Sequence, residues 1–130
     1  FSSLPTINFE QSVTKLLQTK NLPKPKGTIH PKKQTRPTSV PERDKHVQAW
    51  VIQTSNGICE CCQNPAPFIK ISGLPGLEVH HVRRLSDGGS DTVSNAVAIC
   101  PNCHRELHSG ENRDQVKEGL YKMVERLVRE

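Results

Sequence analysis

Two pairs of cysteines have the spacing of a metal site. Cys59 and Cys62 form one Cys-x-x-Cys pair, and Cys100 and Cys103 form another at the expected start of a helix. A tight turn or helix start with this spacing brings two sulfurs to one ion, so the two pairs supply the four thiolates of tetrahedral zinc. Because four protein ligands leave no position for water, we expect one structural zinc ion. Cys61, the fifth cysteine, lies between two ligands, and we expect its side chain to point away from the ion.

Four histidines have the spacing of a second metal site. His104 and His108 are four residues apart in a predicted helix, so their imidazoles lie on one face and can share an ion. His80 and His81 end a predicted strand, and neighbouring strand residues point in opposite directions. We therefore expect one of this pair to join the metal ligands. The other can act as a general base, because the pKa of an unligated imidazole lies close to neutrality.

These residues lie in a predicted order of strand, loop, strand and helix. Residues 77–81 form the first strand, and the run Ala-Val-Ala-Ile at 96–99 forms the second. Asp87-Gly88-Gly89 marks a turn in the loop between them. Pro101 begins a short helix that carries Cys103, His104 and His108. This order brings an imidazole from the first strand over the helix that carries two others.

Another helix is expected before the first cysteine pair. Ser39-Val-Pro-Glu42 has the pattern of a capping box with proline at the first helical position, and Gly57 ends the helix. Trp50, the only tryptophan, is expected in the core rather than as a platform for base stacking. The predicted buried stripe consists of Val47, Trp50, Val51 and Thr54.

Helices are also predicted at both ends of the chain. Residues 8–19 form a short one with Asn8 as N-cap, and residues 112–130 form a longer one with Asn112 as N-cap. Their apolar stripes are Phe9, Val13, Leu16 and Leu17, and Val116, Leu120, Met123, Val124 and Leu127. Residues 20–41 contain half of the prolines, six Lys or Arg residues and no acid, as in a phosphate-binding strap or a solvated tether. We therefore predict a helix within 1–19, a basic linker over 20–41 and one domain over 42–130.

The composition favours a basic protein of a reducing compartment. The formal net charge of +5 and the isoelectric point near 9.1 favour a polyanionic partner, because Lys and Arg displace the counterions condensed on phosphates. An odd count of five cysteines is unlike a disulfide framework, and no stretch resembles a signal peptide or a membrane span. We expect a cytoplasmic protein with no membrane partner. Because residue 1 is Phe, we also expect the chain to be a piece of a longer protein.

The histidines and one asparagine resemble a known nuclease motif. The residues of the motif are Glu78, His80, His81, Asn95, His104 and His108. Their order is similar to that of the HNH (ββα-metal) endonucleases, including the colicin-type nucleases with three metal-binding histidines. By position, the resemblance implies that His81 is the general base and that His80, His104 and His108 hold the catalytic metal. It also implies that Asn95 holds His81 in place through the loop backbone and that Glu78 orients a ligand imidazole.

A wider stretch, residues 39–108, resembles the C-terminal nuclease domain of McrA-like modification-dependent restriction endonucleases. The segments that carry this likeness are Val47-Gln-Ala-Trp50, Gly57-Ile-Cys59, Ala66-Pro-Phe68 and Cys100 to His108. The resemblance implies a small, zinc-stabilised α+β domain of the ββα-metal (treble-clef-like) type, flanked by helices. It also implies a bacterial or phage-type enzyme that cuts double-stranded DNA carrying 5-methylcytosine and leaves 5′-phosphate and 3′-hydroxyl ends.

Several further expectations follow from this family. Three imidazoles are borderline-soft ligands, so the catalytic ion is expected to be Mn²⁺, Ni²⁺, Co²⁺ or Zn²⁺ rather than Mg²⁺. A double-strand cut needs two sites, which favours a homodimer. Two alternatives stay open, namely a non-enzymatic zinc module that binds DNA or protein, and an HNH nuclease of homing, phage or toxin type. The candidates for phosphate contact, which are ordinary surface charges under the alternative interpretation, are Arg83, Arg84, Arg105 and Arg113.

Overall fold

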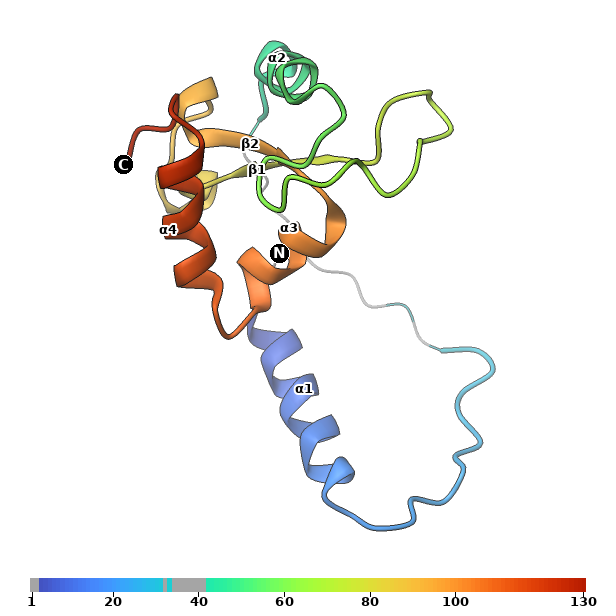
Figure 1. The fold of residues 1–130 in the computed structure, drawn as a ribbon. Coiled ribbons are helices and arrows are strands. Elements are labelled where there is room, and N and C mark those ends of the chain that lie inside the picture. The colour runs from blue at the N-terminus through green and yellow to red at the C-terminus, as the bar shows by residue number, and fades with distance from the viewer. Residues whose placement is uncertain (1–2, 32, 34–41) are drawn as a thin grey trace. The chain divides into compact units, whose positions relative to one another are not determined.

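Figure 1 shows the computed structural model, which describes residues 3–31, 33 and 42–130. For residues 3–9 it describes the backbone alone. Contacts within the chain divide it into two compact units, Phe1–Pro37 and Thr38–Glu130. Among the described residues, no helix is both long and apolar enough to span a membrane.

The first unit contains the helix α1 (Ser3–Leu17). The predicted start of this helix is wrong, because Asn8 lies inside the helix and not at its N-cap. Pro5 falls in the first turn, where a missing backbone N–H costs little, so the helix can begin well before Asn8. From residue 10 onward, the described side chains of this unit are exposed, and residues 18–31 and 33 form no helix or strand.

An antiparallel hairpin forms the centre of the second unit. β1 (Glu78–His81) pairs with β2 (Ala96–Ile99) in a register that places Glu78 opposite Ile99 and His81 opposite Ala96. β2 is buried along its whole length, as an uninterrupted apolar run predicts. Both predicted strands are confirmed, except that β1 begins one residue after Leu77. The loop between them contains two short 3-10 turns, η1 (Leu85–Asp87) and η2 (Val93–Asn95).

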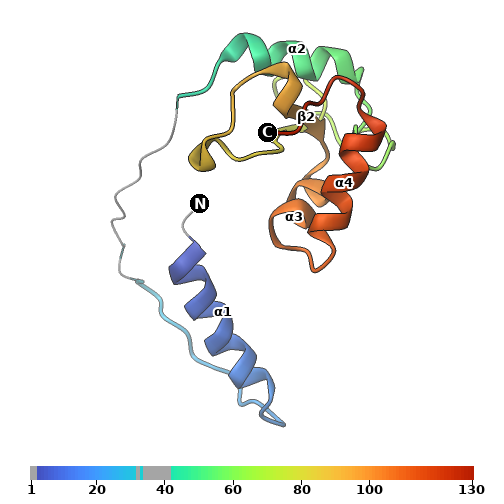
Figure 2. The ribbon, with the colours of Figure 1, turned by 90° about the vertical axis from the view of Figure 1, so that its left-hand side faces the viewer.

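Two helices lie on opposite sides of this hairpin. Figures 1 and 2 show α2 (Lys45–Ser55) on one side and α3 (Pro101–Ser109) on the other. α3 begins at Pro101 as predicted, and the sulfur of its N-cap, Cys100, accepts a hydrogen bond from the Cys103 N–H. The hairpin is therefore covered on both sides, and one of the covering helices carries the predicted metal ligands.

α2 differs from its prediction at its start and in its buried face. Most of the expected capping box, residues 39–41, lies outside the described residues, and the helix begins later, with the Asp44 side chain accepting from the His46 N–H. Trp50 is 44% exposed, so its predicted place in the core is wrong. The Arg126 guanidinium lies over its ring, 5.4 Å from the centroid. The buried face instead follows Val47, Val51 and Ser55, and the expected stripe residue Thr54 is exposed.

The C-terminal helix is shorter than predicted. α4 (Arg113–Met123) ends where Val124 becomes extended, seven residues before the predicted end at residue 130. Val124 and Leu127 are buried as expected, but Met123 is 47% exposed. A turn at Glu125 and Arg126 follows the helix, and Arg126 donates to the carbonyls of Val93 and Ala96 and forms a two-point ion pair with Glu60. These bonds attach the end of the chain to the hairpin and to the first cysteine turn.

Candidate metal centres and active site

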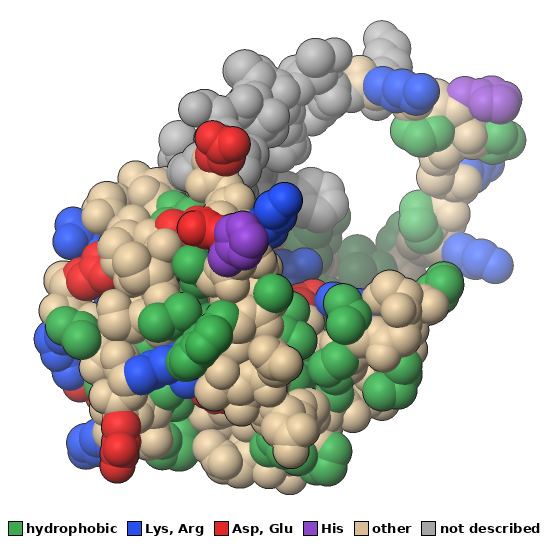
Figure 3. All heavy atoms as spheres, turned by 90° about the horizontal axis from the view of Figure 1, so that it is seen from above, with side chains coloured by type: hydrophobic (Ala, Val, Ile, Leu, Met, Phe, Trp, Pro, Cys, Tyr) green, Lys and Arg blue, Asp and Glu red, His purple; other side chains and the backbone are tan. Residues whose placement is uncertain are grey.

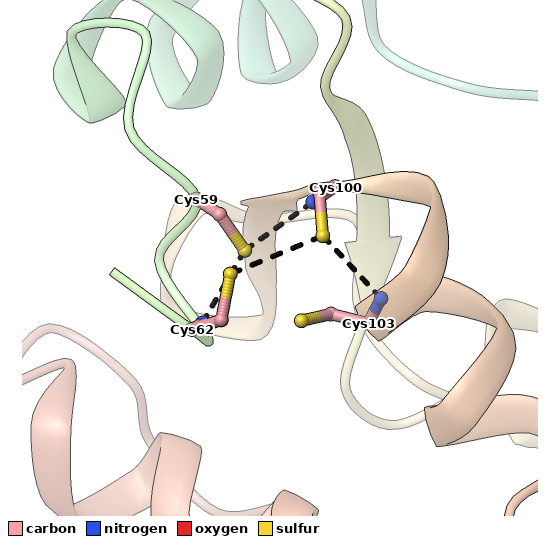
Figure 4. Close-up of side chains that lie close together, drawn as sticks. All are labelled: Cys59, Cys62, Cys100 and Cys103. Carbon is pink, nitrogen blue, oxygen red and sulfur yellow. Dashed lines mark hydrogen bonds between the residues drawn. The ribbon is translucent and has the colours of Figure 1, made fainter. Parts of the chain in front are cut away.

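The four cysteines of the two Cys-x-x-Cys pairs converge. The sulfurs of Cys59, Cys62, Cys100 and Cys103 all lie within 4.8 Å of one another. Figure 4 shows them pointing into one space between the first cysteine turn and the start of α3. The turn is closed by the Cys59 N–H, which donates to the Asn64 carbonyl at 2.8 Å, and α3 supplies the second pair from its first turn.

Backbone N–H groups surround these sulfurs. Cys59 Sγ accepts from the N–H groups of Cys61, Cys62 and Cys100 at 3.3–3.4 Å, and Cys100 Sγ accepts from Cys103 at 3.5 Å. Burial raises the pKa of the Cys59 thiol, but these hydrogen bonds outweigh burial and lower it to about 7. Four soft sulfur donors at this separation fit a tetrahedral zinc ion.

Cys61 is not a member of this converging group in the described chain. Its side chain is half-buried and packs against the core of the second unit. Burial raises the pKa of the Cys61 thiol, as it does those of Cys100 and Cys103.

Three of the histidines form a second converging group. The ring nitrogens of His80, His104 and His108 lie within 4.8 Å of one another, and the Nε2 atoms of His104 and His108 are 3.0 Å apart. The His80 ring meets those of His104 and His108 at centroid separations of 5.2 and 5.1 Å. Burial lowers the pKa of His80 to about 3, and the neighbouring His104 acts in the same direction. A neutral imidazole is the form that binds a metal, so this donor set fits a borderline transition metal.

Glu78 lies beside this group, on the same strand as His80. Its Oε1 is 2.7 Å from His104 Nδ1, which leaves His104 Nε2 directed at His108. A carboxylate that accepts from one ring nitrogen fixes the tautomer in which the other nitrogen has the lone pair for a metal.

His81 lies outside the converging group, as the alternation along β1 leads one to expect. Its Nε2 is 2.9 Å from Oδ1 of Asp91, and both side chains are largely buried, with 6% and 19% exposed. The second carboxylate oxygen of Asp91 accepts from the Asp44 N–H at 2.6 Å, at the N-cap of α2. The histidine therefore has a carboxylate partner that is itself held by a helix start.

Asn95 connects the two ends of the loop that carries Asp91. This fully buried side chain accepts from the Arg83 N–H at 2.9 Å and donates to the carbonyls of Arg83 and Ser90 at 2.9 and 2.8 Å. Gly89 packs so tightly that an added Cβ would collide with the Arg83 carbonyl oxygen and lie 2.8 Å from that of Arg84. Both features shape residues 82–95 into one compact loop next to His81.

Asp91 was missed by reasoning from sequence. It lies in a polar loop that also contains Asp87, and no spacing rule distinguishes the two carboxylates. Asp91 is brought to His81 by the fold of the loop, and the fold depends on tertiary contacts of Gly89 and Asn95. Its presence beside the predicted base could be found only from the structure.

The four candidate arginines divide into two kinds. Arg83 and Arg113 each donate to a backbone carbonyl, of Asp87 and Gly110 respectively. The side chains of Arg84 and Arg105 are exposed and make no hydrogen bond or ion pair within the described chain, and both add positive charge near His108. On the face shown in Figure 3, basic and acidic side chains are interspersed rather than gathered into one basic patch.

Comparison with known proteins shows what this site is similar to. The HNH endonuclease family model matches residues 59–110, which include both converging groups and His81. The chain therefore matches an HNH endonuclease domain over these residues, and the predicted α+β fold is confirmed. The chain is also similar to McrA-type restriction enzymes. It is 50% identical over 115 residues to the type IV methyl-directed restriction enzyme EcoKMcrA of Escherichia coli (strain K12), which covers 88% of this chain and 41% of that protein.

Two further similarities are narrower. The structure of the type IV phosphorothioation-dependent restriction endonuclease ScoMcrA matches with a TM-score of 0.57 and 33% identity, over 65% of this chain and 19% of that one. Anaredoxin of Nostoc sp. (strain PCC 7120 / SAG 25.82 / UTEX 2576) is 44% identical over 32 residues, which is 25% of this chain and 42% of that protein. The chain thus spans less than half the length of each of these relatives.

Proposed function

We propose that this chain is the nuclease part of a modification-dependent restriction enzyme that hydrolyses phosphodiester bonds in double-stranded DNA. The observation that carries the proposal is the convergence of His80, His104 and His108 next to a separate histidine, His81, with a buried carboxylate partner. A purely structural metal site has no need for a second, oriented imidazole at its edge. The HNH family match and the McrA-type relatives support the same class of reaction.

The cysteine group and the histidine group would have different roles. The four cysteines would hold a structural zinc ion, which leaves no open coordination position. The three histidines would hold the catalytic ion, with coordination positions left for phosphate and water. A divalent metal bound there would stabilise the negative charge that develops on the phosphate and on the departing 3′ oxygen. Three imidazole donors favour Mn²⁺, Ni²⁺, Co²⁺ or Zn²⁺ over Mg²⁺.

The side chains of this domain would carry the proton transfers. His81 would take a proton from a water molecule, and the water oxygen would form a bond to phosphorus as the bond to the 3′ oxygen breaks. The 3′ oxygen leaves with the bonding electron pair and takes up a proton, which gives 5′-phosphate and 3′-hydroxyl ends. Asn95 would hold the loop beside His81, and Glu78 would hold the His104 ring. Arg84 and Arg105 would bind flanking phosphates.

The test of this function is cleavage of a supercoiled plasmid that carries 5-methylcytosine, with Mn²⁺, followed by analysis of the ends. Nicked or linear products with 5′-phosphate ends are expected from the wild type. Loss of cleavage is expected from His104→Ala and from His108→Ala. A wild type that cleaves no DNA with any of the four transition metals would contradict the proposal and favour a non-enzymatic zinc module.

The proposed DNA substrate carries 5-methylcytosine, because the relative with 50% identity is described as methyl-directed. ScoMcrA is described as phosphorothioation-dependent, so the two modifications need to be compared directly. Plasmids that differ only in cytosine methylation or in phosphorothioation, cut in parallel, distinguish the two. Equal cutting of modified and unmodified plasmids would contradict modification dependence in this chain.

We also propose that two copies of the chain act together to cut both strands of a duplex. Sedimentation of the DNA complex tests this proposal.

A further inference from the structure

We infer that Asp91 is a positioning residue for His81, holding the imidazole in one orientation and one tautomer. The inference rests on the proposed role of His81 as the general base. Asp91 is not one of the HNH motif residues, and no role has been given to it so far.

The contacts of Asp91 leave its carboxylate little freedom. One oxygen lies 2.9 Å from His81 Nε2, and the other accepts from the Asp44 backbone N–H at 2.6 Å. The Asp91 side chain is 19% exposed and that of His81 is 6% exposed, so water competes weakly for this pair. The loop that carries Asp91 is closed by Asn95, which donates to the carbonyl of the adjacent Ser90.

This arrangement decides which nitrogen of His81 can act as a base. An ionised carboxylate can only accept, so His81 Nε2 must be the nitrogen that donates. The lone pair is then on Nδ1, which is the nitrogen available to take a proton from water. Burial opposes ionisation of Asp91, but the hydrogen bonds from Asp44 and His81 outweigh it and lower the pKa of this carboxyl group. The same negative charge stabilises the imidazolium that forms when His81 takes up a proton.

Asp91→Asn is the informative substitution, because both partners of Asp91 are hydrogen-bond donors in this arrangement. An amide has one acceptor oxygen, so it can satisfy either the Asp44 N–H or His81 Nε2–H, and its NH₂ group must face the other. If the NH₂ faces His81, Nε2 becomes the acceptor and the lone pair is lost from Nδ1. Asp91→Glu keeps the charge and can restore part of the function.

A loss of activity caused by unfolding must be distinguished from a loss caused by a misplaced His81 imidazole. Glu118→Gln is the matched control, since it makes the same change from carboxylate to amide in an exposed ion pair with Arg129 that no residue of the site shares. It should leave cleavage unchanged. Zinc content and circular dichroism of every variant establish that the variant is folded.

The experiment measures kcat and KM for cleavage of a DNA duplex with Mn²⁺ by the wild type, His81→Ala, Asp91→Asn, Asp91→Glu and the double variant His81→Ala/Asp91→Asn. We expect Asp91→Asn to lower kcat by about 10²–10⁴-fold with little change in KM, and Asp91→Glu to recover part of it. In the His81→Ala background, Asp91→Asn should cost nothing further, because Asp91 acts through His81. Nitrogen-15 shifts of His81 should show a protonated Nε2 in the wild type and a changed tautomer in Asp91→Asn.

Three results would overturn the inference, and they differ in whether the proposed role of His81 survives. If Asp91→Asn keeps wild-type kcat while His81→Ala is inactive, the positioning role fails and the proposed base stands. If His81→Ala is as active as the wild type, the proposed base fails and the role of Asp91 fails with it. An equal loss from Asp91→Asn in the wild-type and His81→Ala backgrounds would also contradict positioning.

Discussion

Adjacent residues of one strand have different surroundings in this domain. His80 faces the imidazoles of α3, and His81 faces Asp91 and the start of α2. The difference follows from the alternation of a β-strand, in which neighbouring side chains point to opposite sides. A dipeptide of two histidines can therefore supply one metal ligand and one base without the two competing for the ion.

Substitution of Glu78 tests whether its carboxylate orients the His104 imidazole. Glu78→Ala removes the carboxylate that lies 2.7 Å from His104 Nδ1, so we expect affinity for Mn²⁺ to fall by about 10–100-fold. Titration calorimetry measures this affinity, with the exposed Glu111→Ala as a control that should leave it unchanged. An unchanged affinity in Glu78→Ala would show that this contact does not orient the ligand.

The roles of the histidines could be predicted from the sequence because their spacing determines the directions of their side chains. A separation of four on a helix and adjacency on a strand define directions before any tertiary structure is known. Asp91 has no such relation to His81, because the path between them is an irregular loop closed by Asn95 and Gly89. Trp50 was assigned to the core from its residue type. In the structure it is 44% exposed, and the Arg126 guanidinium lies over its ring.

At the scale of elements, the loop between β1 and β2 determines the geometry around His81. Gly89→Ala would place a methyl group against the Arg83 carbonyl, and we expect a loss of about 1–3 kcal/mol in the free energy of unfolding. Gly119→Ala is the matched control in α4, where an added Cβ meets no atom within 4 Å. Because alanine is the better helix former, that variant should gain about 0.5–1 kcal/mol. Urea denaturation of both variants checks the signs, and an unchanged Gly89→Ala would contradict the tight packing of the loop.

The two candidate metal sites should differ in how the loss of their ions affects the fold. A mild chelator should remove the ion from the three histidines and abolish cleavage, with the circular dichroism unchanged. Removal of zinc from the cysteines, or Cys103→Ser, should unfold the second unit, because small zinc domains derive much of their folding free energy from the metal. Metal analysis and circular dichroism follow the two steps. A unit that stays folded after losing all zinc would contradict a structural role for the cysteines.

The regular elements of the second unit were largely predictable, and their ends less so. β2 and the start of α3 follow directly from an apolar run and from Cys100-Pro101. The end of α4 was not predictable, because the apolar stripe continues through Val124 and Leu127. Arg126 attaches the end of the chain to Glu60 and to the carbonyls of η2 and β2, and no local pattern encodes those distant partners.

At the scale of the whole molecule, the net charge of +5 gives a general attraction to DNA, whereas specific residues decide where phosphates bind. Arg84→Ala and Arg105→Ala should each weaken DNA binding and reduce the slope of log K against log salt by about 1. Arg113→Ala should leave the slope nearly unchanged, because that side chain already donates to the Gly110 carbonyl. Fluorescence anisotropy over a salt series measures all three slopes, and equal slopes in all variants would contradict this division of the arginines.

We propose that the chain hydrolyses DNA with His81 as its general base, next to a metal held by three histidines. The most direct measurement is the rate of plasmid cleavage by the wild type and His81→Ala, with Mn²⁺ and Mg²⁺ in parallel. We predict cleavage by the wild type that is faster with Mn²⁺, and a rate at least about 10²-fold lower for His81→Ala with either ion. Cleavage by His81→Ala at the wild-type rate would contradict the claim.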